Sequence, residues 1–196
     1  DSLTRFAMAQ REIGLAAGEP PTTKGYPPSV FALLAGLLER TGTHDGPGSI
    51  TGFYTVLVEG DDVNDPIADA IRAIVDGHII LSRGIAEKGT YPAVDLLSST
   101  SRVMVDVVGE KHLKLNQIMR RTLATYREAE DLINIGAYVK GSNPEIDYAI
   151  TKKPLIQKFI QQGMNEHTDL KECEEHILQI FGDRLEEDTT PEENSA

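Results

Sequence analysis

The sequence of 196 residues contains no tryptophan and a single cysteine, Cys173. One cysteine excludes an internal disulfide bond, so a reducing compartment such as the cytosol is the simplest expectation. Basic residues are also scarce, since 19 lysines and arginines stand against 31 aspartates and glutamates, which gives a formal net charge of −12. A surface of this charge repels nucleic acids and anionic lipids. The composition therefore argues against nucleic-acid binding.

Several motifs that identify common enzymes are also missing from these residues. No apolar run approaches the roughly 20 residues that a membrane-spanning helix needs. No serine or cysteine stands in a G-x-S-x-G nucleophile motif, and there is no G-x-x-x-x-G-K-[ST] phosphate loop. Cys173 and His176 have the spacing of half a zinc site, but no second pair accompanies them. None of these patterns assigns a chemistry to the chain.

What the sequence does contain is an alternation of helix-like and strand-like segments. Ser2 can cap a first helix, Pro28 can open a second, and Asp65 followed by Pro66 can start a third. Three apolar runs have the character of buried strands, namely ITGFYTVLV at 50–58, HIILS at 78–82 and AVDLL at 93–97. The order strand, helix, strand, helix, strand predicts part of an α/β fold with a parallel sheet.

The second half of the chain has helical patterns only. We expect one long amphipathic helix over 109–136, two shorter helices from Pro144 and Pro154, and a last helix that Thr168 caps. These segments predict a small helical domain. The acidic end of the chain, from residue 182 on, is short of apolar residues and is expected to be disordered.

One arginine, Arg102, follows the third predicted strand and a run of hydroxyl residues, Ser98 to Ser101. Ligands of parallel sheets bind beyond the carboxyl ends of the strands. A planar guanidinium suits phosphate oxygens, and the hydroxyls could add donors. The alternative is a structural salt bridge at a domain junction. Similarly, the aspartate-rich loop from Glu59 to Pro66 could hold a hard cation, although a solvated loop with a helix cap is the preferred interpretation.

Four blocks of the sequence together resemble a known family: DSLTRFAMAQREIG, GYPPSVFALLAGLLER, GSITGFYTVLVEGDDVNDPIADAIRAIVDGHIILSR and YPAVDLLSSTSRVM. They are similar to the second half of the flagellar protein export ATPases, relatives of the rotary ATP synthase subunits and of type III secretion ATPases. The resemblance implies an α/β fold. The first part of the chain would be the C-terminal part of the parallel sheet of a RecA-like P-loop NTPase, and a small all-α domain would follow it. The implied boundaries are 1–103 for the ATPase part, 104–181 for the helical domain and 182–196 for the tail.

The resemblance also implies roles for four residues. Asp1 matches the Walker B aspartate, which holds the magnesium shell of the nucleotide. Without the resemblance, the preferred interpretation of Asp1 is an aspartate that caps a helix. Arg5, in the same DSLTR motif, would brace this site or serve the structure only. Tyr91 matches the tyrosine that stacks on adenine, and the alternative is a tyrosine packed in the turn before Pro92. Arg102 matches the arginine of the SxSR segment, an arginine finger that reaches into the neighbouring subunit's site.

The implied function is magnesium-dependent ATP hydrolysis by a homohexameric ring that energises flagellar type III protein export. The ligands would be ATP or ADP and Mg²⁺, and the place would be the cytoplasmic face of the membrane near the export apparatus. The partners would be a coiled-coil central stalk protein, a regulator of the ATPase and, at most peripherally, the membrane through the export gate. The phosphate loop and the catalytic glutamate belong upstream of Asp1, so the chain is expected to be a C-terminal fragment that is inactive alone.

Two segments resemble the stalk-facing regions of the rotary subunits. These are the loop Gly60–Pro66 and the connection Ala137–Asp147, although the connection lacks the acidic DELSEED pattern. Two other functions remain open. One is the type III secretion ATPase of an injectisome, and the other is a non-catalytic ring subunit that acts as an interaction module.

Overall fold

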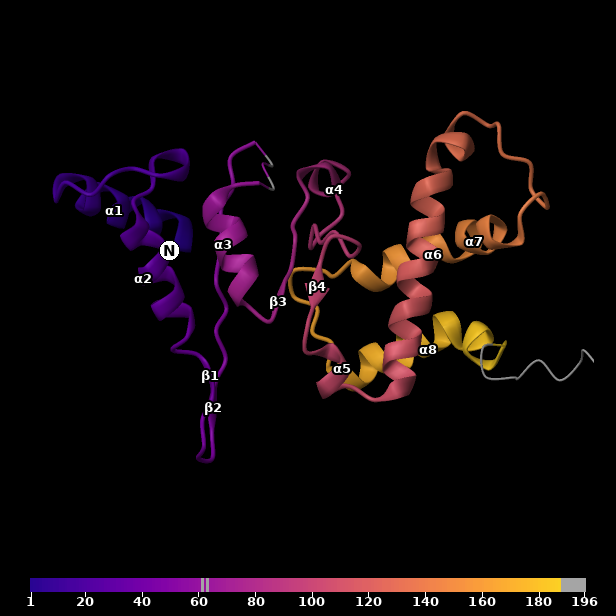
Figure 1. Ribbon diagram of the computed structural model, residues 1–196. Helices are drawn as coiled ribbons and strands as arrows, with labels where there is room; N and C mark the ends of the chain where they lie inside the picture. Colours follow the sequence, from indigo (N-terminus) through magenta and orange to yellow (C-terminus); the bar gives the residue numbers. More distant parts are fainter. Residues whose placement is uncertain (61, 63, 188–196) are drawn as a thin grey trace, which may run out of the picture. The chain divides into compact units, whose positions relative to one another are not determined.

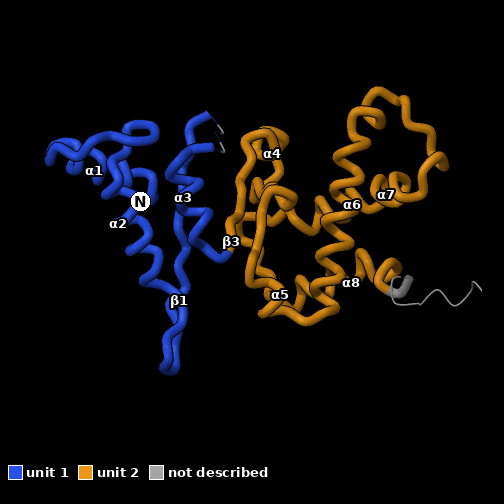
Figure 2. The backbone as a smooth tube through the Cα atoms, viewed as in Figure 1, with its two compact units in different colours: residues 1–76 blue, residues 77–196 orange. Residues whose placement is uncertain are grey.

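The computed structural model describes residues 1–60, 62 and 64–187. The chain divides between Asp76 and Gly77 into two compact units (Figures 1 and 2). Each unit has its own apolar core. No helix in the described part of the chain is both long and apolar enough to cross a membrane.

The first unit is built from three helices and a short hairpin. Its elements are α1 (Leu3–Ala16), the 3-10 turn η1 (Thr23–Gly25), α2 (Pro28–Leu38), β1 (Gly42–Thr43), β2 (Ser49–Ile50) and α3 (Pro66–Ile74). The predicted starts of α1 and α3 are confirmed, because the Ser2 hydroxyl accepts a hydrogen bond from the N–H of Arg5 and the Asp65 carboxylate accepts from the first N–H groups of α3. Each cap satisfies backbone donors that the helix itself leaves without partners.

The core of the first unit packs α1, α2 and α3 against one another. Its buried side chains are Leu3, Ala7, Tyr26, Val30, Leu34, Leu38, Ile67 and Ile71. The extended segment after β2 binds to the start of α1. The N–H of Leu3 donates to the Thr55 carbonyl at 2.9 Å, and the Thr4 hydroxyl both donates to the Leu57 carbonyl and accepts from its N–H. These bonds fix the beginning of α1, where two of the predicted site residues lie.

The predicted buried parallel strands do not form among the described residues. Only Ser49–Ile50 at the start of the first run is a strand, and Phe53 in its middle is 92% exposed. The other two runs meet in antiparallel order through a bridge that joins Leu81 to Val94. Next to this bridge, β3 (Gly77–His78) pairs antiparallel with β4 (Thr100–Ser101), which follows the third run. These two runs cannot pair in parallel through a direct crossover, because the intervening helix α4 (Arg83–Glu87) is one turn long, whereas a parallel crossover needs a dozen or more residues.

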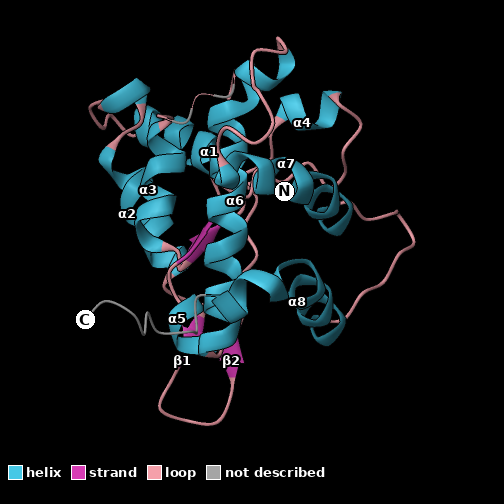
Figure 3. Ribbon diagram, turned by 90° about the vertical axis from the view of Figure 1, so that its right-hand side faces the viewer, coloured by secondary structure: helices cyan, strands magenta, loops and turns pink. Residues whose placement is uncertain are grey.

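The second unit contains the remaining helices. After β3, α4 and β4 come α5 (Met104–Val107), α6 (Glu110–Asn134), α7 (Pro144–Ile160) and α8 (Leu170–Glu187), and helices dominate the described residues (Figure 3). The long predicted helix is confirmed as α6, and Gly136, whose φ is +72°, follows its end. Asn143 caps α7 through its side-chain oxygen. The C-terminal segment predicted from 182 is helical as far as Glu187, and residues 188–196 lie outside the described residues.

Two details of the helical part differ from prediction. Pro154 does not begin a helix but lies inside α7, where it removes one backbone hydrogen bond. The helix continues because Ala149 and Ile156, on either side of the proline, are completely buried. At α8 the cap is not Thr168: Asp169 accepts from the N–H of Glu172 at 2.8 Å, and the Glu172 carboxylate accepts from the N–H of Asp169.

The core of the second unit lies between α6, α7 and α8. Its buried members are Leu115, Ile118, Met119, Ile156, Ile177 and Phe181, with Leu96 among the side chains packed against it. Leu96 belongs to the segment just before β4. The helical core therefore contacts the loop that leads to Arg102.

Candidate functional site

Asp1 and Arg5 lie together at the start of α1. The Asp1 carboxylate accepts from the N–H of Ser2 at 2.9 Å and lies 3.8 Å from Nε of Arg5, and both side chains are more than 70% exposed. Ser2, not Asp1, is the helix cap, so the carboxylate of Asp1 keeps oxygen lone pairs toward solvent. Mg²⁺ takes one or two carboxylates together with phosphate oxygens and waters. Asp1 fits such a role as a single ligand, and no cluster of three metal-binding side chains exists among the described residues.

Tyr91 lies in an open pocket of the second unit. The pocket has a volume of 430 Å³ and joins the turn around Tyr91 to the end of α7 and the loop after it. Its lining residues are Gly89, Tyr91, Lys158, Gln161, Gln162, Gly163 and Glu166. The Tyr91 carbonyl accepts from the N–H of Gln162 at 3.0 Å, while its side chain is largely open, the residue being 59% exposed. An exposed aromatic residue that lines an open pocket can stack on a flat ligand.

Arg102 follows β4 directly and is exposed. Two of the four hydroxyl residues before it, Ser98 and Ser99, bond within their own turn. The Ser98 hydroxyl donates to the Asp95 carboxylate at 2.9 Å, and the Ser99 hydroxyl donates to the Asp95 carbonyl at 2.7 Å. Ser98 and Ser99 therefore shape the turn that precedes Arg102.

Asp95 is the centre of this turn. Its carboxylate accepts from the N–H groups of Leu97 and Ser98, and Arg127 of α6 donates to the same carboxylate at 3.0 Å. Partial burial acts to raise the pKa of Asp95, but the hydrogen bonds from Arg127 and Ser98 outweigh it, so the pKa lies below its ordinary value of 3.8. Neither Asp95 nor Arg127 was singled out from the sequence.

The lowered pKa of Asp95 predicts an acid-dependent loss of stability. Because the folded-state pKa is below the unfolded one, the ionised carboxylate stabilises the fold at pH values above 3.8, and this contribution is lost as the pH falls through the folded pKa. Asp95→Asn should cost about 1–2 kcal/mol at pH 7 and make the loss of stability below pH about 4 smaller. Thermal unfolding of both proteins from pH 3 to pH 8 measures this, and parallel curves over the whole range would contradict it.

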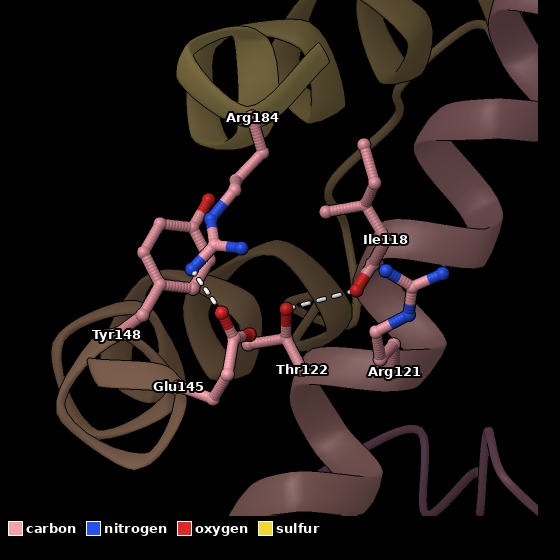
Figure 4. Close-up of a pocket in the computed structure, with 6 residues that line it drawn as sticks. All are labelled: Ile118, Arg121, Thr122, Glu145, Tyr148 and Arg184. Atoms are coloured by element: carbon pink, nitrogen blue, oxygen red, sulfur yellow. Dashed lines mark hydrogen bonds and ion pairs between the residues drawn. The ribbon is translucent and has the colours of Figure 1, made fainter. Parts of the chain in front are cut away.

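A second cavity lies between α6, α7 and α8 (Figure 4). Arg184 donates to Glu145 at 2.8 Å, and its guanidinium stacks 4.3 Å from the centroid of the Tyr148 ring. The cavity measures 20 Å³, which is room for about one water molecule. Its side chains join α7 to α8, so this cavity is part of the packing of the helices and not a ligand site.

The predicted site residues thus fall into two groups. Asp1 and Arg5 form an ion pair in the first unit, while Tyr91 and Arg102 belong to the second unit, at the two ends of the segment 91–102. The sequence missed the residues that hold this segment, above all Arg120 of α6, which donates three hydrogen bonds to it. One signal could have indicated them: Arg120 and Arg127 are seven residues apart and therefore share one side of the predicted long helix.

Two family models match the chain. The nucleotide-binding domain of the ATP synthase alpha/beta family matches residues 1–101, and the C-terminal domain of the type III secretion ATPase EscN matches residues 108–179. The "Flagellum-specific ATP synthase" of Bacillus subtilis (strain 168) is 57% identical over 93% of this chain and 41% of its own length. The "Type 3 secretion system ATPase" of Sinorhizobium fredii (strain NBRC 101917 / NGR234) is 55% identical over 88% of this chain and 38% of its own length.

A solved structure gives the same result. The assembled ATPase EscN in complex with its central stalk EscO, from the type III secretion system of enteropathogenic E. coli, superposes with a TM-score of 0.83 at 45% identity over 92% of this chain and 42% of that chain. The chain spans about two fifths of the length of the curated relatives it matches.

Proposed function

The chain belongs to the ATP synthase alpha/beta family, and on that premise we propose that the protein containing it hydrolyses ATP with Mg²⁺, as a ring, to energise flagellar type III protein export. The observation that carries the proposal is the segment 91–102. At one end it presents an exposed tyrosine ring in an open pocket, and at the other an exposed arginine beyond a braced turn. The proposal assigns these two ends to two different nucleotides in the ring.

The chemistry is the transfer of the terminal phosphoryl group of ATP to water. The water oxygen forms a bond to the γ-phosphorus and gives up a proton, the bond to the bridging oxygen breaks, and ADP, phosphate and the proton leave. Asp1 would hold the magnesium shell of its own subunit's nucleotide, with Arg5 fixing the carboxylate through their ion pair. Bound Mg²⁺ would supply charge neutralisation on the phosphates. The guanidinium of Arg102 would neutralise charge on the transferred group in the neighbouring subunit.

A finger that acts across an interface needs a neighbouring subunit beside each site, and a closed ring of heterologous interfaces gives every site such a neighbour. The proposed assembly is a homohexamer around a coiled-coil stalk protein. The structure of EscN assembled with its central stalk EscO supports an assembly of subunits around a stalk protein. The proposed setting also includes a regulator of the ATPase and a position at the cytoplasmic face of the membrane. Any contact with the membrane would be peripheral, through the export gate.

The second candidate is the ATPase of an injectisome, which the 55% identity to the Sinorhizobium fredii protein supports. Deletion of the gene in the source organism separates the two. The flagellar proposal expects loss of flagellar filaments, restored by the wild-type gene, with any injectisome secretion unaffected. Normal filaments together with loss of injectisome secretion would assign the protein to the second system, and a full-length protein without magnesium-dependent ATP hydrolysis would reject both.

Replacing Tyr91 by alanine tests the proposed contact with the base. Stacking of a base on an aromatic ring is worth about 1–3 kcal/mol, so the KM for ATP should rise about 5- to 150-fold while kcat changes little. The matched control is Tyr91→Phe, which keeps the aromatic ring and loses only the hydroxyl, and its KM should stay close to that of the wild type. Steady-state kinetics of the full-length protein measure both, and an unchanged KM in Tyr91→Ala would remove Tyr91 from the site.

A further inference from the structure

One arginine of α6, Arg120, binds three backbone carbonyls of the turn that leads to Arg102. Nη1 of Arg120 donates to the carbonyl of Leu96 at 2.6 Å and to that of Ser99 at 3.1 Å, and Nη2 donates to the carbonyl of Leu97 at 2.9 Å. These carbonyls belong to a segment outside any helix, where they have no regular partner. The guanidinium has five donors in a rigid plane, so it can fix three acceptors at once, which a lysine ammonium on a flexible stem does less well.

Asp95 also fixes this turn, through hydrogen bonds from the turn's backbone N–H groups. The carboxylate of Asp95 accepts from the N–H groups of Leu97 and Ser98, so Leu97 is bonded through both its N–H and its carbonyl. The Ser99 hydroxyl accepts from the N–H of Ile80, which joins the turn to the segment after β3. The chain therefore enters β4, and then Arg102, from a turn whose backbone groups are almost all bonded.

Both cations that hold the turn come from α6. Arg120 binds the carbonyls, and Arg127, two turns further along the helix, binds the Asp95 carboxylate. Helix α6 is itself packed into the core with α7 and α8 through Leu115, Ile118 and Met119. The position of the turn is thus tied to the helical core and not only to its neighbours in sequence.

We propose that Arg120 is a positioning residue for Arg102: by binding the turn 96–99 to α6 it sets where the guanidinium of Arg102 stands in the neighbouring subunit's site. This inference rests on the proposed function, because it takes Arg102 as the finger. A displacement of about 1 Å in a group that must meet the reacting phosphoryl can cost about 100-fold in rate. Loss of the three hydrogen bonds should therefore slow the chemical step without weakening substrate binding.

The test is Arg120→Lys in the full-length protein, which keeps the charge and the aliphatic stem but loses the planar fork. The expected result is a kcat lower by about 10- to 100-fold at an unchanged KM for ATP, with ring assembly intact. Arg121→Lys is the matched control, because Arg121 is the next residue of α6 and has no bond to the turn; it should keep wild-type kcat. Arg127→Gln is the second variant. The Arg127 side chain is 53% exposed, so the fold should tolerate the change. The kcat of this variant should fall several-fold, because it loses the ion pair with Asp95.

A double variant separates positioning from general damage to the fold. In an Arg102→Ala background, Arg120→Lys should lower kcat by less than about twofold further, because both changes remove the same contribution. The proposal is overturned if Arg120→Lys keeps full kcat. It is also overturned if the double variant loses kcat by the product of the two factors that the single variants lose. If Arg102→Ala alone keeps full activity, the proposed role of the finger fails, and that result is distinct from a failure of Arg120 to act through it.

Discussion

Replacing Arg102 by alanine in the full-length protein should lower the kcat of ATP hydrolysis by about 10³- to 10⁵-fold. The reason is that a fixed cation at the transferred phosphoryl group stabilises charge that is spread over its oxygens in the transition state. The corresponding increase in the barrier is about 4 to 7 kcal/mol. Because the contact is made chiefly in the transition state, the KM for ATP should change much less than kcat.

The matched control for this experiment is Arg83→Ala. Arg83 begins α4 in the same unit and is also exposed, so its loss changes the net charge equally. Its kcat should stay within about twofold of wild type, as expected for a surface substitution away from the site. Arg102→Lys should recover only part of the rate, since an ammonium does not reproduce the two-pronged contact of a guanidinium with phosphate oxygens. A wild-type rate in Arg102→Ala would end the assignment of Arg102 as a finger.

Replacing Phe181 by alanine should give the largest loss of stability in the helical domain. Phe181 of α8 is completely buried and packs in the core that α6, α7 and α8 share. Removing a buried phenylalanine ring leaves a cavity and costs about 3–5 kcal/mol. Since native domains are stable by only about 5–15 kcal/mol, this loss takes away a large part of the total.

Hydrogen exchange of the full-length protein measures this effect locally. In Phe181→Ala the backbone amides of α6, α7 and α8 should exchange much faster, whereas those of α1 to α3, which belong to the other core, should change little. Leu170→Ala is the control, because Leu170 also lies in α8 but is 70% exposed. Equal protection in Phe181→Ala and Leu170→Ala would contradict the buried role of the ring.

Much of the fold could be predicted from short patterns. The family and the α/β fold class are confirmed by the matching nucleotide-binding domain and by the likeness to EscN. The caps at Ser2 and Asp65 are confirmed because a capping side chain acts on backbone only two or three residues away. Pairing of strands is not local. The runs 78–82 and 93–97 have the composition of parallel strands, but the connection between them is too short for a parallel crossover. They therefore meet in antiparallel order.

The support of the candidate site could not be predicted for the same reason. Arg120 binds carbonyls that are 21 to 24 positions away in the sequence, and carbonyl groups carry no sequence signal. Ser98 and Ser99 present the opposite case, because hydroxyls near an arginine suggest a phosphate site, whereas these two donate to Asp95 within their own turn. Assignment of Asp1, Arg5, Tyr91 and Arg102 to roles depends on the family resemblance and stays a proposal for experiment.

The most direct test of the account is a mixing experiment with two inactive variants of the full-length protein. Asp1→Asn removes the metal ligand from a subunit's own site but keeps its finger, and Arg102→Ala removes the finger but keeps the site. Each variant alone should be nearly inactive. If the finger acts across the interface, an equal mixture should regain about a quarter of the wild-type rate, because half of the intact sites then face an intact finger. A mixture that stays as inactive as its components would contradict the central claim that Arg102 serves the neighbouring subunit.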